Sequence, residues 1–205
     1  NDYLDTNGIK IYTNLDVNAQ TYLENAVTGN IKSDSDIQTS SVMVENKTGK
    51  VIALVGGKNY EKSQYNRAVY SKRQVGSTMK PFLYYAALED GFTASSTFLS
   101  EPTTFSLENN KTYSPANFGN IYPSKPIPLL LAIAYSDNIY AVKTHLFLGE
   151  DKIIEVAKKA GIKTKMEKTV SLPLGTEELN IMEMTNAYST LANEGVRNNL
   201  YLIRK

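Results

Sequence analysis

A serine and a lysine separated by two residues are the first side chains of the sequence that could do chemistry together. Ser77 and Lys80 stand three positions apart, so a helix would place them on one face. A neutral lysine there can take the serine proton, and burial favours the neutral form by lowering its pKa from about 10.4. At a helix N-terminus, free backbone N–H groups, including that of Ser77, can stabilise an oxyanion. The pair therefore indicates nucleophilic acyl transfer.

A second polar group, Ser136-Asp137-Asn138, lies between two apolar stretches with helical character. All three residue types are good helix N-caps, so a cap is one interpretation. In the other, Ser136 lies beside Lys80 as a proton relay, and the Asn138 amide binds both the lysine and a substrate carbonyl.

Lys47-Thr48-Gly49 is the third short motif, and it also allows two interpretations. It joins two apolar, β-branched runs in "SVMVENKTGKVIALVGG", which is typical of a β-hairpin with a glycine in the turn. The other interpretation is catalytic, because Lys-Thr-Gly occurs together with a Ser-x-x-Lys and a Ser-Asp-Asn in a class of serine enzymes.

The composition limits which other functional sites the chain can contain. The 205 residues include 41% hydrophobic residues and carry a formal charge of +1, which predicts a globular domain without a basic nucleic-acid surface. Without cysteine there can be no disulfide, thiolate metal site or cysteine nucleophile. The single histidine, His145, lies in an apolar helical context that favours a core position over a catalytic one. No run reaches the roughly 20 apolar residues of a membrane span.

The elements that must position these residues follow from the pattern. We expect a strand at 9–14, then a helix from Asp16 to Thr28 that is stopped by Gly29. A buried helix should begin near Ser77, with Pro81 in its first turn and Gly91 at its end. Residues 92–128 read as extended loops, and three helical stretches follow, the last with Asn180 and Glu183 at capping-box spacing.

The segment "RQVGSTMKPFLYYAALEDG" resembles the active-serine segment of the class A penicillin-binding proteins, which typically reads Arg-Gln-x-Gly-Ser-Thr-x-Lys-Pro-Phe. Further segments are similar in family order: "KTGKVIALVGG", "YSPANFGN", "LLLAIAYSDNIYAVK" and "LPLGTEELNIMEMTNAYSTLANEGV". The resemblance covers nearly the whole chain. It implies an α/β (α+β) serine β-lactamase/DD-peptidase-like fold, with an antiparallel sheet flanked by helices and an all-helical lobe.

Carried over to this chain, the resemblance implies a peptidoglycan D,D-transpeptidase that needs no cofactor or metal. Ser77 would be the acylated nucleophile, with its backbone N–H in the oxyanion hole, and Lys80 the base. Ser136 would relay the proton, and Asn138 would bind the substrate. The expected partners are peptidoglycan stem peptides and β-lactams, at the extracytoplasmic face of a bacterial membrane whose anchor lies outside the chain.

The chain departs from the family in its third motif. The family's substrate-binding Lys-Thr-Gly lies on a later strand, beyond Lys205, so Lys47-Thr48-Gly49 is expected to be only a hairpin turn. We expect residues 40–205 to be the N-terminal portion of the transpeptidase domain, which holds only the first sheet strands and is completed by a second polypeptide. Residues 1–39 would be a segment that links it to an upstream glycosyltransferase domain.

Three other functions use the same residues. A β-lactamase would hydrolyse the acyl-enzyme with water, although no segment resembles its deacylating glutamate. A non-catalytic penicillin sensor would be acylated once without turnover. In a purely structural domain, Ser77 would cap a helix and Lys80 would extend toward solvent.

Overall fold

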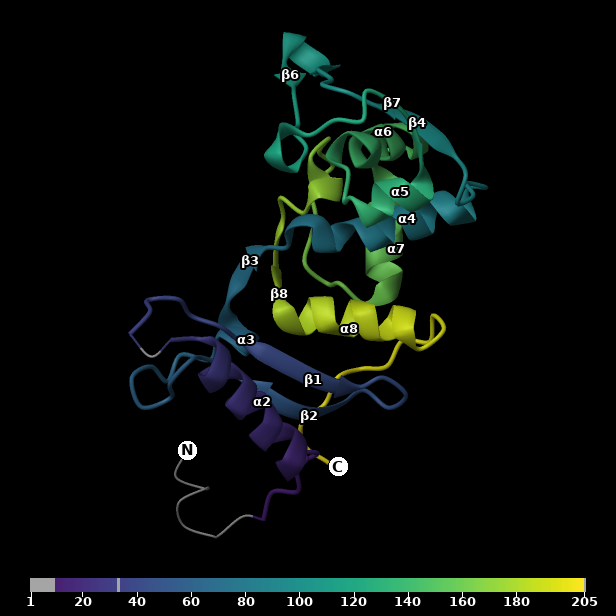
Figure 1. Cartoon of the computed structure of the whole chain (residues 1–205). Coiled ribbons are helices and arrows are strands. Elements are labelled where there is room, and N and C mark those ends of the chain that lie inside the picture. The colour runs from purple at the N-terminus through teal and green to yellow at the C-terminus, as the bar shows by residue number, and fades with distance from the viewer. Residues whose placement is uncertain (1–9, 33, 205) are drawn as a thin grey trace. The chain divides into compact units, whose positions relative to one another are not determined.

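The computed structural model describes residues 10–32 and 34–204, and the chain divides into two compact units (Figure 1). The first unit contains residues 1–72, 160–162 and 180–205, and the second contains residues 73–159 and 163–179. The chain passes from one unit to the other within two short strands that pair with each other, β3 (Lys72–Gln74) and β8 (Glu178–Asn180).

The first unit is built on one antiparallel hairpin. Strand β1 (Ser41–Glu45) pairs with β2 (Lys50–Val55), with an irregularity between Met43 and Val44. Alternate residues of β2 are buried, as expected for a strand with one face in a core. Helix α2 (Val17–Asn30) packs against β2, and helix α8 (Ile181–Ala192) packs against β1 (Figure 1). The predicted hairpin is thus confirmed.

Two details of this unit differ from the prediction. Of the predicted strand at 9–14, residue 9 lies outside the described residues, and only Thr13 forms an isolated bridge, with Ile203. Asp16 does cap α2 by accepting a hydrogen bond from the Ala19 N–H, but the helix passes through Gly29 and ends at Asn30. Gly29 is not among the glycines with a positive φ, so it does not adopt the left-handed conformation of a glycine that ends a helix.

The second unit is mainly helical and carries the residues of the candidate site. Helix α4 (Lys80–Glu89) packs against helix α6 (Asn138–Leu148), and their Phe82, Tyr84, Ile139 and Tyr140 are almost completely buried. The helical elements are η1 (Gly76–Met79), α4 (Lys80–Glu89), α5 (Leu129–Ala134), α6 (Asn138–Leu148), α7 (Asp151–Ala160) and η4 (Leu172–Leu174).

The loop region 92–128 contains two short antiparallel pairs that the sequence did not predict. Strand β4 (Thr97–Ser100) pairs with β7 (Lys125–Pro128), and β5 (Phe105–Ser106) pairs with β6 (Thr112–Tyr113). The β7 strand contains two prolines, which lack the N–H of a regular ladder, so its sequence resembles a loop. This lobe is therefore not all-helical.

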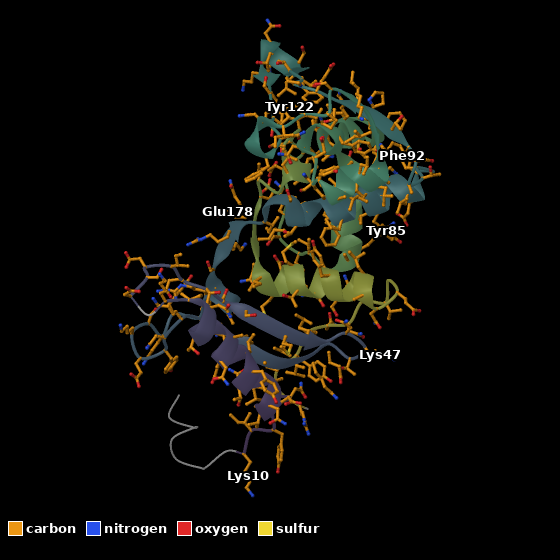
Figure 2. All side chains as sticks on the ribbon, viewed as in Figure 1. Lys10, Lys47, Tyr85, Phe92, Tyr122 and Glu178 are labelled. Carbon is orange, nitrogen blue, oxygen red and sulfur yellow. The ribbon has the colours of Figure 1, made fainter. Side chains whose placement is uncertain are left out.

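Helix α4 is buried on most but not all sides. The predicted burial is confirmed for six of its ten residues, whereas Tyr85 is 44% exposed and Leu88 is 52% exposed. Figure 2 labels Tyr85 on this helix. The helix ends as predicted near Gly91, whose φ of +92° is the left-handed conformation that glycine favours after a helix.

Candidate active site

Ser77 and Lys80 lie on consecutive turns of a helix that changes type between them. Residues Gly76–Met79 form a 3-10 turn, and the α-helix starts at Lys80, whose N–H donates to the Ser77 carbonyl. Pro81 occupies the first turn, where its missing N–H costs no helical hydrogen bond. Ser77 is exposed, whereas only 3% of the Lys80 surface is accessible. Ser77 lies within the 3-10 turn and is not its N-cap residue, which is Val75.

Three oxygen atoms surround the Lys80 ammonium. Its Nζ donates to the Ser136 carbonyl at 2.5 Å, to the Ser136 hydroxyl at 3.1 Å and to Oδ1 of Asn138 at 2.7 Å. Three donors thus meet three acceptors, and the lysine does not extend toward solvent. The structure brings Lys80 together with Ser136 and Asn138, which lie more than 50 residues later in the sequence.

The types of these acceptors decide where a neutral lysine would turn its lone pair. The carbonyl of Ser136 and the amide oxygen of Asn138 can only accept, so both hold N–H groups of the amine in either protonation state. The Ser136 hydroxyl can either accept or donate. It is therefore suited to exchanging a proton with Lys80.

Burial increases the fraction of Lys80 that is neutral near pH 7. Desolvation lowers the pKa of Lys80 to about 8, although the Asp137 carboxylate acts in the opposite direction. With this pKa, roughly a tenth of the lysine is neutral at pH 7.

Ser136 reaches Lys80 because its backbone adopts a conformation that L-residues rarely take. Its φ is +52°, and it directly follows Tyr135, the C-cap residue of helix α5, in a Schellman motif. The Ser136 N–H donates to Ile133 and the Asp137 N–H donates to Ala132. Glycine is the usual residue at this position, so a serine here is strained by about 1 kcal/mol.

Asp137 begins the next helix and shows that the capping interpretation was right for one of the three residues. Its Oδ1 accepts from the Tyr140 N–H at 2.7 Å and caps α6. Because Asp137 is the cap, its two neighbours are free to turn toward Lys80. The cap is thus confirmed for Asp137, and Ser136 and Asn138 lie beside Lys80, as the second interpretation expected of their positions.

A buried polar cluster behind this loop was not identified from the sequence. It consists of Ser100, Asn117 and Asp137, which are 0%, 8% and 2% exposed. The Asp137 Oδ2 accepts from the Ser100 hydroxyl at 2.5 Å and from Nδ2 of Asn117 at 2.7 Å. Ser100 and Asn117 lie in a segment rich in Ser, Thr, Asn and Pro, so their types do not distinguish them from turn residues. The only signal was that Asn117 belongs to the family-like segment "YSPANFGN".

Gly76 begins the turn that carries Ser77, and it contacts another glycine, Gly175. The Gly76 N–H donates to the Gly175 carbonyl at 3.0 Å, and both residues have positive φ angles. A Cβ on Gly175 would lie 2.0 Å from the Gly76 oxygen, so only glycine allows this approach.

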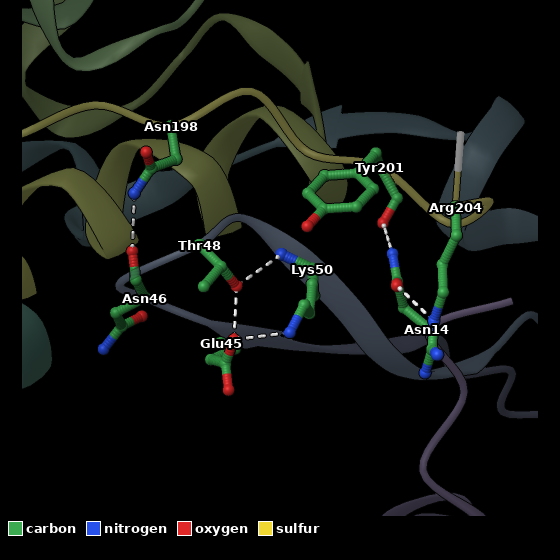
Figure 3. Close-up of polar contacts among 8 residues, drawn as sticks. All are labelled: Asn14, Glu45, Asn46, Thr48, Lys50, Asn198, Tyr201 and Arg204. Carbon is green, nitrogen blue, oxygen red and sulfur yellow. Dashed lines mark hydrogen bonds and ion pairs between the residues drawn. The ribbon is translucent and has the colours of Figure 1, made fainter.

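Lys47-Thr48-Gly49 forms the tight turn of the β1–β2 hairpin in the other unit. The Thr48 hydroxyl donates to the Glu45 carboxylate and accepts from the Lys50 N–H (Figure 3). Gly49 has a φ of +80°. The motif therefore has a complete structural explanation as a turn, with its hydroxyl satisfied locally.

His145 is completely buried on α6, and this burial argues against a catalytic serine–histidine pair. Its Nε2 lies 3.1 Å from the Thr169 carbonyl, and burial lowers its pKa. Among the described residues, its Nδ1 has no hydrogen-bond partner. No group of three potential metal ligands occurs in the described parts of the chain.

Comparisons with known proteins show the family to which the chain belongs. The sequence model of the penicillin binding protein transpeptidase domain matches residues 39–205. Penicillin-binding protein 2D of Bacillus subtilis is 46% identical over 195 residues, which are 95% of this chain and 28% of that protein. Penicillin-binding protein 1A of Pseudomonas aeruginosa is 38% identical over 170 residues, 82% of this chain and 21% of that protein. The chain thus spans about a quarter of the length of these curated relatives.

Two solved structures share the fold. The crystal structure of penicillin-binding protein 1A from Haemophilus influenzae has a TM-score of 0.77 and 34% identity, covering 82% of this chain and 25% of that one. PonA1 from Mycobacterium tuberculosis, in complex with penicillin V, has a TM-score of 0.84 and 22% identity, covering 100% of this chain and 56% of that one. The α/β fold expected from the sequence is confirmed. The chain belongs to the family of penicillin-binding protein transpeptidase domains.

Proposed function

We propose that this chain is part of a peptidoglycan D,D-transpeptidase that works through an acyl-enzyme on Ser77. The observation that carries the proposal is the buried Lys80 ammonium, one turn after an exposed serine and surrounded by Ser136 and Asn138. A structural lysine gains nothing from a lowered pKa, whereas a general base needs one.

In the first half-reaction, the Ser77 hydroxyl attacks the carbonyl of the penultimate D-Ala of a stem peptide while Lys80 takes its proton. The developing oxyanion accepts a hydrogen bond from the Ser77 backbone N–H. The proton passes through Ser136 to the nitrogen of the terminal D-Ala, which leaves as a free amino acid. Asn138 holds both Lys80 and the substrate amide in place.

In the second half-reaction, an amine of a neighbouring stem peptide attacks the ester and forms the cross-link, and Ser77 regains its proton. A β-lactam enters the first half-reaction in the same way. Its leaving nitrogen stays attached through the opened ring, so the ester persists and inhibits the enzyme.

The position of the chain in the whole protein is also part of the proposal. Residues 40–205 form the N-terminal portion of the transpeptidase domain, and further sequence, on the same or a second polypeptide, supplies the substrate-binding Lys-Thr-Gly and the second oxyanion donor. Residues 1–39 lead from a glycosyltransferase domain, and the protein acts at the extracytoplasmic face of the cell membrane. Among the described residues, no helix is long and apolar enough to cross that membrane.

The test is to label the protein that contains the whole transpeptidase domain with a fluorescent penicillin and to map the labelled residue. We expect label on Ser77 that disappears in Ser77→Ala, and release of D-Ala from a stem-peptide substrate. Equal labelling of Ser77→Ala would overturn the site. Labelling without D-Ala release would indicate a sensor, and rapid hydrolysis of the penicillin would indicate a β-lactamase.

A further inference from the structure

Both polar atoms of the Asn117 side chain form hydrogen bonds with residues of the loop 136–138. Its Oδ1 accepts from the backbone N–H of Asn138 at 2.8 Å and lies 3.4 Å from that of Ile139. Its Nδ2 donates to Asp137 at 2.7 Å and to the Ile121 carbonyl at 3.2 Å, with Ser100 Oγ at 3.4 Å. A buried amide in this setting is fully satisfied.

The residue before Asn117 completes the contact. The Ala116 carbonyl accepts a hydrogen bond from Nδ2 of Asn138 at 2.7 Å. Because this bond holds the nitrogen of the Asn138 amide, the amide oxygen faces the other way, toward Lys80. Residues 116 and 117 thus fix both the backbone and the side chain of Asn138.

We propose that Asn117 is a positioning residue for acylation, which holds Ser136 and Asn138 in the geometry that Lys80 requires. The inference rests on the proposed function. It is carried by the fact that the strained Ser136 backbone lies directly beside the two residues that Asn117 binds, Asp137 and Asn138. A left-handed serine persists only where its surroundings hold it there.

The alternative is that Asn117 only stabilises the fold, and a matched residue separates the two roles. Asn180 is also a buried asparagine, 9% exposed, and it lies in the other unit. Its Oδ1 accepts from the Met182 N–H at 2.8 Å, and its Nδ2 donates to the carbonyls of Val69 and Ser71. Truncation of either residue leaves comparable buried groups unpaired and should destabilise the protein by about 1–3 kcal/mol.

The first experiment compares Asn117→Ala with Asn180→Ala in the protein that contains the whole domain, at a temperature where both variants are folded. We expect Asn117→Ala to slow the acylation of Ser77 by fluorescent penicillin at least tenfold. Asn180→Ala should acylate within twofold of the wild type despite a similar loss of melting temperature.

The second experiment uses Asn117→Asp, whose new carboxylate keeps an acceptor for the Asn138 N–H. Its other oxygen would face Oδ2 of Asp137 at the position of the present 2.7 Å hydrogen bond. Two carboxylates so close share a proton, and the protonated pair restores the missing donor. Lys80 and Tyr84 of α4 also interact electrostatically with Asp137. We expect the acylation rate of this variant, relative to wild type, to be highest at low pH and to fall as the shared proton is lost.

The outcomes distinguish this inference from the proposed function. If wild-type Ser77 is not labelled, the proposed function fails and Asn117 has no acylation to assist. If Ser77 is labelled but Asn117→Ala acylates as fast as Asn180→Ala, or the Asn117→Asp ratio stays flat with pH, only the positioning role is overturned.

Discussion

Ser136 and Gly91 occupy the same position at the ends of two helices. Both directly follow the C-cap residue in a Schellman motif, with φ angles of +52° and +92°. The Phe92 N–H donates to Ala87 after α4, and the Asp137 N–H donates to Ala132 after α5. Glycine suits this conformation, and a serine in its place exchanges stability for a hydroxyl beside Lys80.

Replacement of Ser136 should therefore separate stability from activity. We expect Ser136→Gly to be more stable than Ser136→Ala by about 0.5–1 kcal/mol, because glycine relieves the left-handed strain. Both variants should acylate at least tenfold more slowly than wild type, because each lacks the hydroxyl. Thermal unfolding and penicillin labelling measure the two effects. A glycine variant no more stable than the alanine variant would show that the position is not strained.

Gly175 should tolerate no side chain. Gly175→Ala places a Cβ 2.0 Å from the Gly76 oxygen, so the Ser77 turn or η4 must move. Gly91→Ala is the matched control, since it has a positive φ but no neighbour within 4 Å of its Cβ. We expect a loss of about 1–2 kcal/mol for the control and more than about 3 kcal/mol for Gly175→Ala, measured by denaturant unfolding. Equal losses would contradict the close packing of the two glycines.

The pH dependence of acylation should follow Lys80. The neutral amine is the active form of a base, so the rate should rise about tenfold per pH unit below the lysine pKa of about 8 and level off above it. Rates of penicillin labelling between pH 6 and 9.5, over the range in which the protein stays folded, would measure this rising limb of the pH–rate profile. Lys80→Ala should be slower by at least a hundredfold and lose the limb. A limb that survives in Lys80→Ala would assign it to another group.

Lys47 should not matter for acylation. Its side chain projects from the hairpin turn (Figure 2), and the polar contacts of the turn are made by Thr48, Glu45 and Lys50. We expect Lys47→Ala to acylate within twofold of wild type, with a change in stability within about 0.5 kcal/mol. A hundredfold loss in a folded variant would mean that this Lys-Thr-Gly is the substrate-binding motif after all.

The sequence was most informative where function and local structure use the same residues. Ser77 and Lys80 stand three positions apart, and Pro81 and Gly91 mark the two ends of their helix, so one segment specified both the pair and its support. The hairpin around Gly49 was equally local, because turn chemistry depends on neighbouring residues. The family resemblance then predicted the roles of Ser136 and Asn138.

The predictions were wrong where the structure does not follow from the local sequence alone. Gly29 did not stop α2, because a glycine permits the left-handed conformation that ends a helix but does not require it. Strand β4 pairs with β7, which lies more than 20 residues later and contains two prolines, so neither strand has a recognisable local pattern. The β5–β6 pair is only two residues long on each side, too short to show an alternation. The opposite face of α4 stayed exposed at Tyr85 because the neighbouring helices cover only part of it.

The sequence by itself determined the pair Ser77 and Lys80, the helix that carries them and the family to which they belong. Only the tertiary structure showed that Lys80 is surrounded by Ser136 and Asn138 and that Asp137 is the cap between them. It also showed that Asn117 binds this loop through Asp137 and Asn138. The reason is that burial and hydrogen-bond partners depend on residues tens of positions apart, which no local pattern encodes. The lowered pKa of Lys80 is a property of that environment.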